Sequence, residues 1–105
     1  MDPTASSEEL GRELASGQAE LARLEKRDAE LEAALAQVEH DARRCSDALE
    51  RAGWRSGEAE ARSAMLAEAA TSIKRDREEN RKLRRQLGRR LALLRERAAE
   101  SNPDD

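Results

Sequence analysis

Leucine residues in the first half of the chain recur every three or four positions, and this repeat limits the fold more than any other feature. With Leu10 at position d of a heptad and Leu14 at position a, all seven leucines of residues 1–52 fall at a or d. Eleven of the 13 a and d positions from Leu10 to Ala52 are apolar. A repeat of 3.5 residues sustained this long keeps one apolar stripe on one side of a helix, where another helix must cover it. The sequence therefore predicts an all-α coiled coil.

The same register continues in the second half of the chain without a slip, although the a positions there are poorer. Gly17 and Asp28 interrupt the stripe in the first half, and Asn80 at d interrupts it in the second. We predict that the apolar seam positions form a partner interface and that polar residues at a set its specificity. The predicted interface residues are Leu10, Leu14, Leu21, Leu24, Leu31, Leu35, Val38, Leu49, Trp54, Leu66, Ile73, Leu87, Leu91 and Leu94, and the specificity charges are Asp28, Arg77 and Arg84.

Composition supports extended helices and argues against a compact globular core. Charged residues make up 41% of the chain, and Trp54 is the only aromatic residue. A compact core of this size normally uses several aromatic side chains, because each of them buries a large apolar area. A core of leucine and alanine under a strongly charged surface is typical of a coiled coil.

The segment Gly53–Gly57 divides the chain into two arms of similar length. We expect a flexible tail at 1–7, an acidic helix at 8–52, a break or kink at 53–57, a basic helix at 58–99 and an acidic tail at 100–105. Residues 1–52 carry a net charge of −6 and residues 53–105 a net charge of +3. Two architectures fit this pattern. The unbroken register favours one long kinked helix, whereas arms of similar length and opposite charge favour an antiparallel helical hairpin.

No motif in the chain indicates catalysis, a cofactor or a metal site. His40 is the only histidine and falls at the outward position f, and Cys45 is the only cysteine, so neither a metal cluster nor an intrachain disulfide is expected. The N-terminus lacks a basic patch followed by an apolar run, and no stretch has the length and apolarity of a membrane span. We therefore expect a non-enzymatic intracellular protein, cytoplasmic or nuclear.

The polar seam residues restrict how the helices can pair. In a parallel homodimer, Asp28 would face Asp28 and Arg77 would face Arg77, which is costly when the charges are shielded from water. An antiparallel arrangement sets the acidic half against the basic half, and a partner of complementary charge would solve the problem equally well. Trp54, at position f beside Gly53, is either an anchor for a partner or a cover over the bend.

Three functional hypotheses follow from this pattern. The first is a small structural or scaffold subunit of a larger complex, with other coiled-coil proteins as partners and a hetero-oligomer favoured. Typical settings are the cytoskeleton, the centrosome, the kinetochore or a vesicle tether. The second is a self-assembling antiparallel homo-oligomer. The third is a basic helix that binds nucleic acid, since residues 74–97 hold 11 basic and 4 acidic residues. It is the weakest of the three, because no aromatic residue is available there to stack on bases.

Overall fold

The structure, a computed structural model, describes residues 3–52 and 57–101 and contains two helices. Helix α1 spans Pro3–Ala52 and helix α2 spans Gly57–Ser101, and the described residues contain no strand. Side-chain exposure is described for residues 7–51 and 57–100. The prediction of an all-α fold is confirmed.

Local sequence explains why both helices are long. Alanine, leucine, arginine and glutamate, all strong helix formers, dominate both of them. Pairs spaced three or four residues apart add small contributions: Arg23 Nε donates to Glu20 Oε2 at 3.2 Å, and Gln37 Nε2 donates to Asp41 Oδ1 at 3.1 Å. Each exposed pair of this kind stabilises a helix by only about 0.2–0.5 kcal/mol.

The N-terminal boundary of α1 lies upstream of the tail boundary that the sequence suggested. The capping-box spacing of Ser6 and Glu9 indicates a start near Ser7, whereas α1 begins at Pro3. Proline is well tolerated in the first turn of a helix, because the N–H that it lacks has no partner there.

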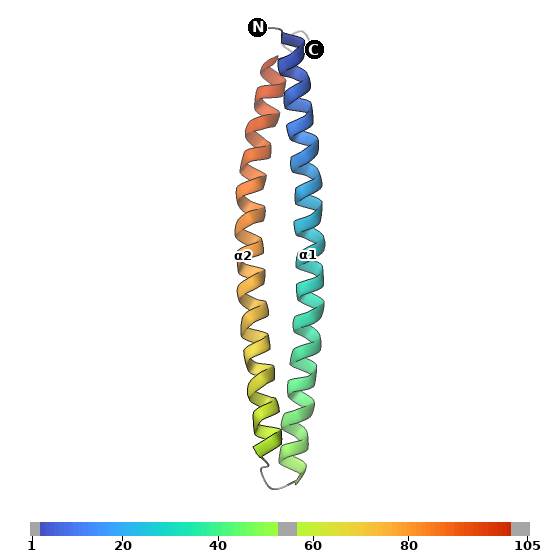
Figure 1. Cartoon of the computed structure of the whole chain (residues 1–105), viewed down its shortest axis with the longest axis vertical. Coiled ribbons are helices and arrows are strands. Elements are labelled where there is room, and N and C mark those ends of the chain that lie inside the picture. Colours follow the sequence, from blue (N-terminus) through green and yellow to red (C-terminus); the bar gives the residue numbers. More distant parts are fainter. Residues whose placement is uncertain (1–2, 53–56, 102–105) are drawn as a thin grey trace. The chain divides into compact units, whose positions relative to one another are not determined.

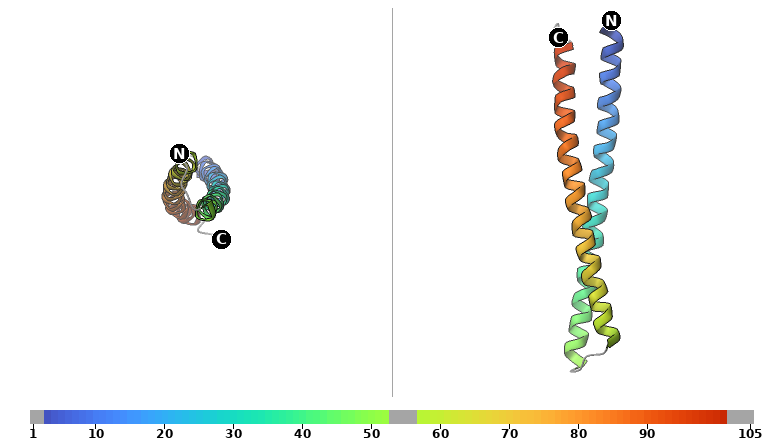
Figure 2. Two further views of the ribbon diagram at one scale, coloured as in Figure 1. Left: turned by 90° about the horizontal axis from the view of Figure 1, so that it is seen from below. Right: turned by 60° about the vertical axis from the view of Figure 1, so that its left-hand side comes forward.

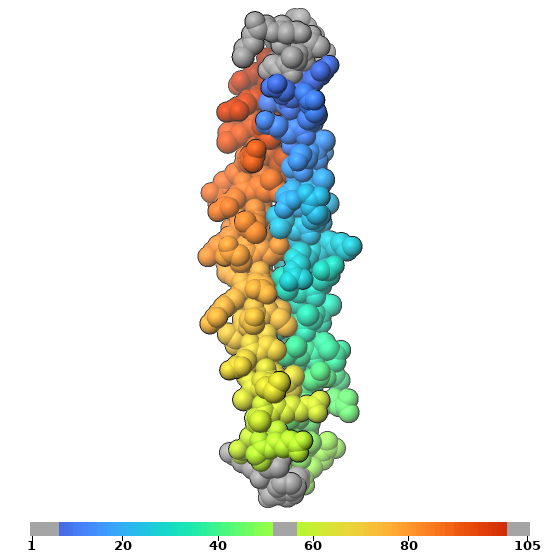
Figure 3. Space-filling model, viewed as in Figure 1, coloured from blue at the N-terminus to red at the C-terminus, as the bar shows by residue number. Residues whose placement is uncertain are grey.

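The chain divides into two compact units, and each of them is an antiparallel pair of helical segments. Unit 1 contains residues 1–27 and 80–105, and unit 2 contains residues 28–79. Within each unit a segment of α1 runs beside a segment of α2 in the opposite direction (Figures 1 and 2). Figure 3 shows the side chains of the two segments meeting along their length in each unit.

Of the two architectures that the sequence allows, the chain adopts the antiparallel helical hairpin. The other architecture, one long kinked helix, which the unbroken register favoured, is not the one that the chain adopts. The proposed bend falls on residues outside the described part of the chain, except that Gly57 is the first residue of α2. Trp54 and residues 102–105 of the expected acidic tail also lie outside the described residues.

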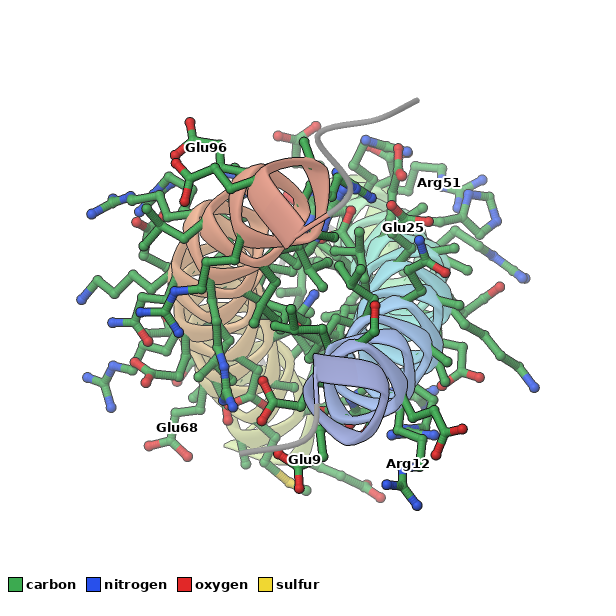
Figure 4. The ribbon with its side chains drawn as sticks, turned by 90° about the horizontal axis from the view of Figure 1, so that it is seen from above. Glu9, Arg12, Glu25, Arg51, Glu68 and Glu96 are labelled. Carbon is green, nitrogen blue, oxygen red and sulfur yellow. The ribbon has the colours of Figure 1, made fainter. Side chains whose placement is uncertain are left out.

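The core of each unit follows the predicted heptad closely. Every a and d position from Ser7 to Leu49 and from Ala59 to Ala98 is buried or half-buried. Among the other residues whose exposure is described, only Asp41 and Ala69 are not exposed, and both occupy the flanking position g. Charged side chains at outer positions point away from the facing helix, as Figure 4 shows for Arg12, Glu68 and Glu96. The register derived from leucine spacing is therefore the packing register.

Full burial is nevertheless rare, as expected when only two helices cover each other. Among the apolar residues whose exposure is described, Leu31, Leu91 and Leu94 alone are fully buried, with 5%, 1% and 5% of their surface exposed. The remaining apolar seam residues keep part of their surface in water. Each unit therefore gains less from burial than a bundle of three or four helices of the same length would.

Candidate helix-pairing sites

Unit 1 contains a close contact between the two helices at a glycine. Leu91 of α2 lies directly over Gly17 of α1, and a Cβ atom added to this glycine would overlap Leu91 Cδ2 and lie 3.4 Å from Leu91 Cγ. Leu87 Cδ1 would lie 3.8 Å from the same added atom. Gly17 therefore interrupts the leucine stripe in order to accept a leucine from the facing helix, which explains why Leu91 is the most buried large side chain described.

A buried asparagine fixes the position of α2 along α1 in the same unit. Asn80 has 5% of its surface exposed, and its Nδ2 donates a hydrogen bond to the backbone carbonyl oxygen of Leu24 at 2.9 Å. A buried amide that loses its partner costs about 1–3 kcal/mol. A shift of the helices relative to each other would break this bond, so Asn80 selects one register at some expense of stability.

Unit 2 contains an ion pair between the two charged residues that occupy its seam. Arg77 Nε lies 3.6 Å from Asp28 Oδ1, and the two side chains are 20% and 19% exposed. This distance exceeds that of a normal hydrogen bond, and Arg77 Nε has no hydrogen-bond partner among the described residues. The pair places opposite charges together inside the seam, as expected for antiparallel packing.

The seam of unit 2 also contains the single cysteine. The Cys45 thiol is half-buried and lies 3.6 Å from the backbone carbonyl oxygen of Ala59 on α2, to which it donates a weak hydrogen bond. A thiol in this position acts mainly as a small apolar side chain. The contact brings the C-terminal part of α1 against the first turn of α2.

Outside the seam, α2 of unit 1 carries an exposed face that combines apolar and basic residues. Leu83 and Leu93 are 44% and 58% exposed and occupy the neighbouring heptad positions g and c. Gln86, Arg90 and Arg97 continue the same c/g stripe, and all three are exposed. We name these five residues the α2 outer face. In residues 80–101 of α2, eight basic residues accompany two acidic ones.

The predicted interface and specificity residues occupy the seam inside the chain itself. All of the predicted leucines, together with Val38 and Ile73, are buried or half-buried within their own unit. Arg84 is half-buried at its a position, while Trp54 lies outside the described residues. Whether any of these residues also contacts another protein stays a prediction.

Sequence reasoning missed two features of these sites. It treated Gly17 as a defect in the stripe, although the glycine accepts Leu91. It also gave no role to Leu83 and Leu93, the two leucines of α2 that do not fall at a or d. Their off-register position was the available signal, because two leucines outside the seam, spaced so that they lie on one side of the helix, do not contribute to packing between the two helices.

Two other kinds of site were searched for among the residues that the structure describes, a metal-binding cluster and a membrane-spanning helix. No group of three or more His, Cys, Asp or Glu side chains in it is arranged to hold a metal ion. Neither described helix contains an apolar window sufficient to cross a membrane. The chain matches no protein-family model, no curated protein and no solved structure.

Proposed function

We propose that the chain is a non-enzymatic coiled-coil interaction subunit that binds an acidic amphipathic helix of another protein and serves as a small structural component of a larger complex. The observation that carries the proposal is the α2 outer face, where Leu83 and Leu93 remain 44% and 58% exposed after the hairpin has formed. Assemblies of cytoskeletal, centrosomal, kinetochore or tethering type are the settings that we propose for such a subunit.

The spacing of the α2 outer face supports helix docking. Leu83, Gln86, Arg90, Leu93 and Arg97 follow one another at intervals of three or four residues, which places them along one side of α2. Apolar residues at such intervals are how one helix recognises another that lies along it. The two leucines would supply apolar contact, and the arginines would select the partner.

Arginine favours an acidic protein partner over a purely apolar one. Its guanidinium group pairs with carboxylates in a bidentate geometry, so acidic residues at matching positions of a partner helix would add specificity to the apolar contact. Nucleic acid presents phosphates to the same arginines, but it gives no role to the two exposed leucines. This difference makes a helical protein the better candidate.

Binding assays with paired variants test the proposal. The wild-type chain, a Leu83→Glu/Leu93→Glu variant and a Met65→Glu control are each used as bait in cell extract under identical conditions. Met65 is also an exposed apolar residue of α2, 69% exposed, but it lies in unit 2. We expect a stoichiometric partner with an acidic heptad repeat to bind the wild-type chain and the Met65→Glu control. The Leu83→Glu/Leu93→Glu variant should lose at least tenfold in affinity for it.

Circular dichroism shows whether each variant keeps its helices, so a loss of binding can be separated from a loss of fold. A partner that binds all three baits equally would contradict the role of the α2 outer face. Binding of the purified chain to duplex DNA or RNA that weakens steeply with salt, without any stoichiometric protein partner, would instead favour the nucleic-acid hypothesis.

A further inference from the structure

Ser46 differs from every other serine and threonine of the chain in the residues that precede it. Arg43 and Arg44 stand three and two positions before it, and no other hydroxyl residue of the sequence has an arginine at both of these positions. Arginine-directed protein kinases recognise two arginines at this spacing, because carboxylates in their substrate groove pair with the two guanidinium groups. The pattern therefore directs such a kinase to one residue of the chain.

The structure leaves this motif at the surface of unit 2. Arg43, Arg44 and Ser46 belong to α1, and all three are exposed. Ser46 occupies position e, beside the seam, and directly follows Cys45 at position d. Its hydroxyl group is therefore accessible, yet a charge added to it would lie next to the line along which the two helices meet.

The seam around Ser46 favours local opening of the helix pair. Protein kinases bind the residues around their target serine in an extended conformation, so this part of α1 has to open before it reacts. The nearby seam positions hold small side chains, all of them half-buried: Ala42, Cys45, Ala59 and Ser63. Small side chains return little apolar surface to water when the helices separate, so opening here costs less than it does between leucines.

We propose that Ser46 is a phosphorylation site for an arginine-directed protein kinase and that its phosphate loosens unit 2. In the reaction the Ser46 Oγ attacks the γ-phosphorus of ATP and forms a new P–O bond, while the bond from that phosphorus to the β,γ-bridging oxygen breaks. ADP leaves with the bridging oxygen, and the hydroxyl proton passes to the carboxylate base of the kinase. The neutral side chain thereby gains about two negative charges at pH 7.

The added charge meets carboxylates from both helices. The Cys45 thiol contacts the carbonyl oxygen of Ala59, so these two d positions lie across the seam from each other. Ser46 and Glu60 are the e positions that follow them, and in an antiparallel pair the e positions of the two helices share one side of the seam. On α1 itself, Glu50 lies four residues after Ser46, a spacing at which like charges repel.

Attraction on the phosphate is weaker than this repulsion. Arg43 lies three residues before Ser46 and attracts it, but the first turn of α2 already holds Glu58 and Glu60, which match the positive end of that helix. Ser46 also lies in the last two turns of α1, which ends at Ala52, and a phosphate near a helix C-terminus opposes the helix dipole. We therefore expect the phosphate to push the two helices of unit 2 apart.

Phosphorylation of the purified chain tests the site. The probe is the catalytic subunit of cyclic-AMP-dependent protein kinase, an arginine-directed enzyme, with Mg²⁺ and ATP. We expect mass spectrometry to find a single phosphate, at Ser46, and none on a Ser46→Ala variant. An Arg43→Gln/Arg44→Gln variant should react more slowly by about tenfold or more, since two charge-assisted contacts to the kinase are lost. The matched control Arg12→Gln/Arg23→Gln removes two exposed arginines elsewhere on α1 and should react at the wild-type rate.

Amide hydrogen exchange of the phosphorylated chain tests the effect on unit 2. We expect exchange in residues 42–51 and 57–66 to be about two- to fivefold faster than in the unmodified chain, because each exposed like-charge contact has a small effect. Residues of unit 1 should exchange at an unchanged rate and serve as the internal reference. In a Glu50→Gln/Glu60→Gln variant, which keeps Ser46 but lacks both carboxylates, phosphorylation should change exchange by less than about twofold.

Two results would overturn the proposal. One is the absence of phosphate at Ser46 of the wild-type chain, and a synthetic peptide of residues 40–50 then shows whether the arginines fail to direct the kinase or α1 fails to open. The other is a phosphorylated chain whose exchange in unit 2 is unchanged or slower, because the phosphate then does not separate the helices. Neither measurement involves a protein partner, so the α2 outer face and the proposed function are tested separately.

Discussion

Units 1 and 2 have the same topology but are packed with different side chains. Seven leucines occupy the seam of unit 1, whereas unit 2 has four, together with Val38 and Ile73. Several seam positions of unit 2 are instead small: Ala42, Cys45, Ala59, Ser63 and Ala70. Unit 1 contains 12 basic and 10 acidic residues, whereas unit 2 contains 8 basic and 13 acidic residues.

The same heptad repeat therefore packs tightly in unit 1 and more loosely in unit 2. Large side chains and a buried hydrogen bond fix the helices firmly in unit 1, where Asn80, Leu91 and Leu94 are fully buried. In unit 2 only Leu31 reaches that degree of burial among the residues described. We infer that unit 2 opens at lower cost than unit 1, because less apolar surface returns to water when its helices separate.

The largest expected effect separates the two units directly. Leu91→Ala in unit 1 and Leu31→Ala in unit 2 should each cost about 2–4 kcal/mol of unfolding free energy, because both delete a buried leucine side chain. Urea denaturation followed by circular dichroism measures the total loss. Amide hydrogen exchange then shows where it falls. We expect Leu91→Ala to speed exchange mainly in residues 7–27 and 80–100, and Leu31→Ala mainly in residues 28–51 and 57–79.

Leu83→Ala serves as a control for these two substitutions, since it removes an exposed leucine of α2 and should cost less than about 1 kcal/mol. Uniformly faster exchange in both core variants would mean that the chain unfolds as one cooperative body, and the contrast between the units would then carry no energetic meaning.

Gly17→Ala should lower stability by about 1 kcal/mol, even though alanine is the better helix former by a similar amount. The added methyl group would displace Leu91, which is only 1% exposed and has little room to move. Gly11→Ala should instead raise stability by up to about 1 kcal/mol, since nothing apart from its chain neighbours and its own helix backbone lies within 4 Å of the added Cβ. Thermal melting of the two variants compares them.

Gly17→Ala in a Leu91→Ala background tests whether the effect of the added methyl group comes from Leu91. With the leucine shortened, Gly17→Ala should become stabilising, and the difference between the two backgrounds measures the coupling of the pair. An unchanged effect of Gly17→Ala would show that Leu91 is not what the glycine accommodates.

Asn80→Leu should raise stability by about 1 kcal/mol, because an apolar side chain replaces an amide at a buried seam position. The same change removes the hydrogen bond to the Leu24 carbonyl, so the helices lose a feature that fixes their register. We therefore expect the Asn80→Leu variant to form a larger number of oligomeric species in sedimentation velocity than the wild-type chain does. A single sharp species of unchanged mass would show that the leucine packing of unit 1 sets the register without the amide.

The ion pair of unit 2 should contribute least. Asp28 and Arg77 are about one-fifth exposed, and 3.6 Å separates Arg77 Nε from Asp28 Oδ1. We expect a coupling free energy of about 0.5–1 kcal/mol in a double-mutant cycle of Asp28→Ala and Arg77→Ala, with a smaller value at high salt. If the cycle gives no coupling free energy at low salt, the ion pair does not stabilise the antiparallel arrangement.

Most of the fold could be predicted from leucine spacing, because the spacing determines which side of each helix is buried. This holds even at unfavourable positions: Ser63 and Arg84 are half-buried as the register requires. The choice between hairpin and single helix could not be predicted in the same way. Both arrangements bury the same positions. For the hairpin the cost is the free energy of forming a turn, whereas a single long helix needs a second chain to cover its stripe and loses entropy on association.

The sequence predicted which types of contact the seam would contain, but not which residues would meet across it. Opposite charges at a positions indicate that antiparallel helices can neutralise each other, and Asp28 does meet Arg77. The fit of Leu91 over Gly17 depends on how far the two helices are shifted along each other, which side-chain spacing alone does not determine. The same shift decides that Asn80 reaches a backbone oxygen rather than another side chain.

The acceptor for Asn80 is a main-chain atom, and this has a consequence for how the sequence can change over time. No substitution at position 24 deletes the carbonyl, so that side chain is free to vary among apolar types while the amide keeps its partner. Successive carbonyls of a helix are offset by about 1.5 Å along the axis and by about 100° around it, so after a slip of one residue no carbonyl occupies the position that the Leu24 carbonyl held. Asn80 therefore constrains the axial position of α2 against α1, and it does so whatever side chain occupies position 24.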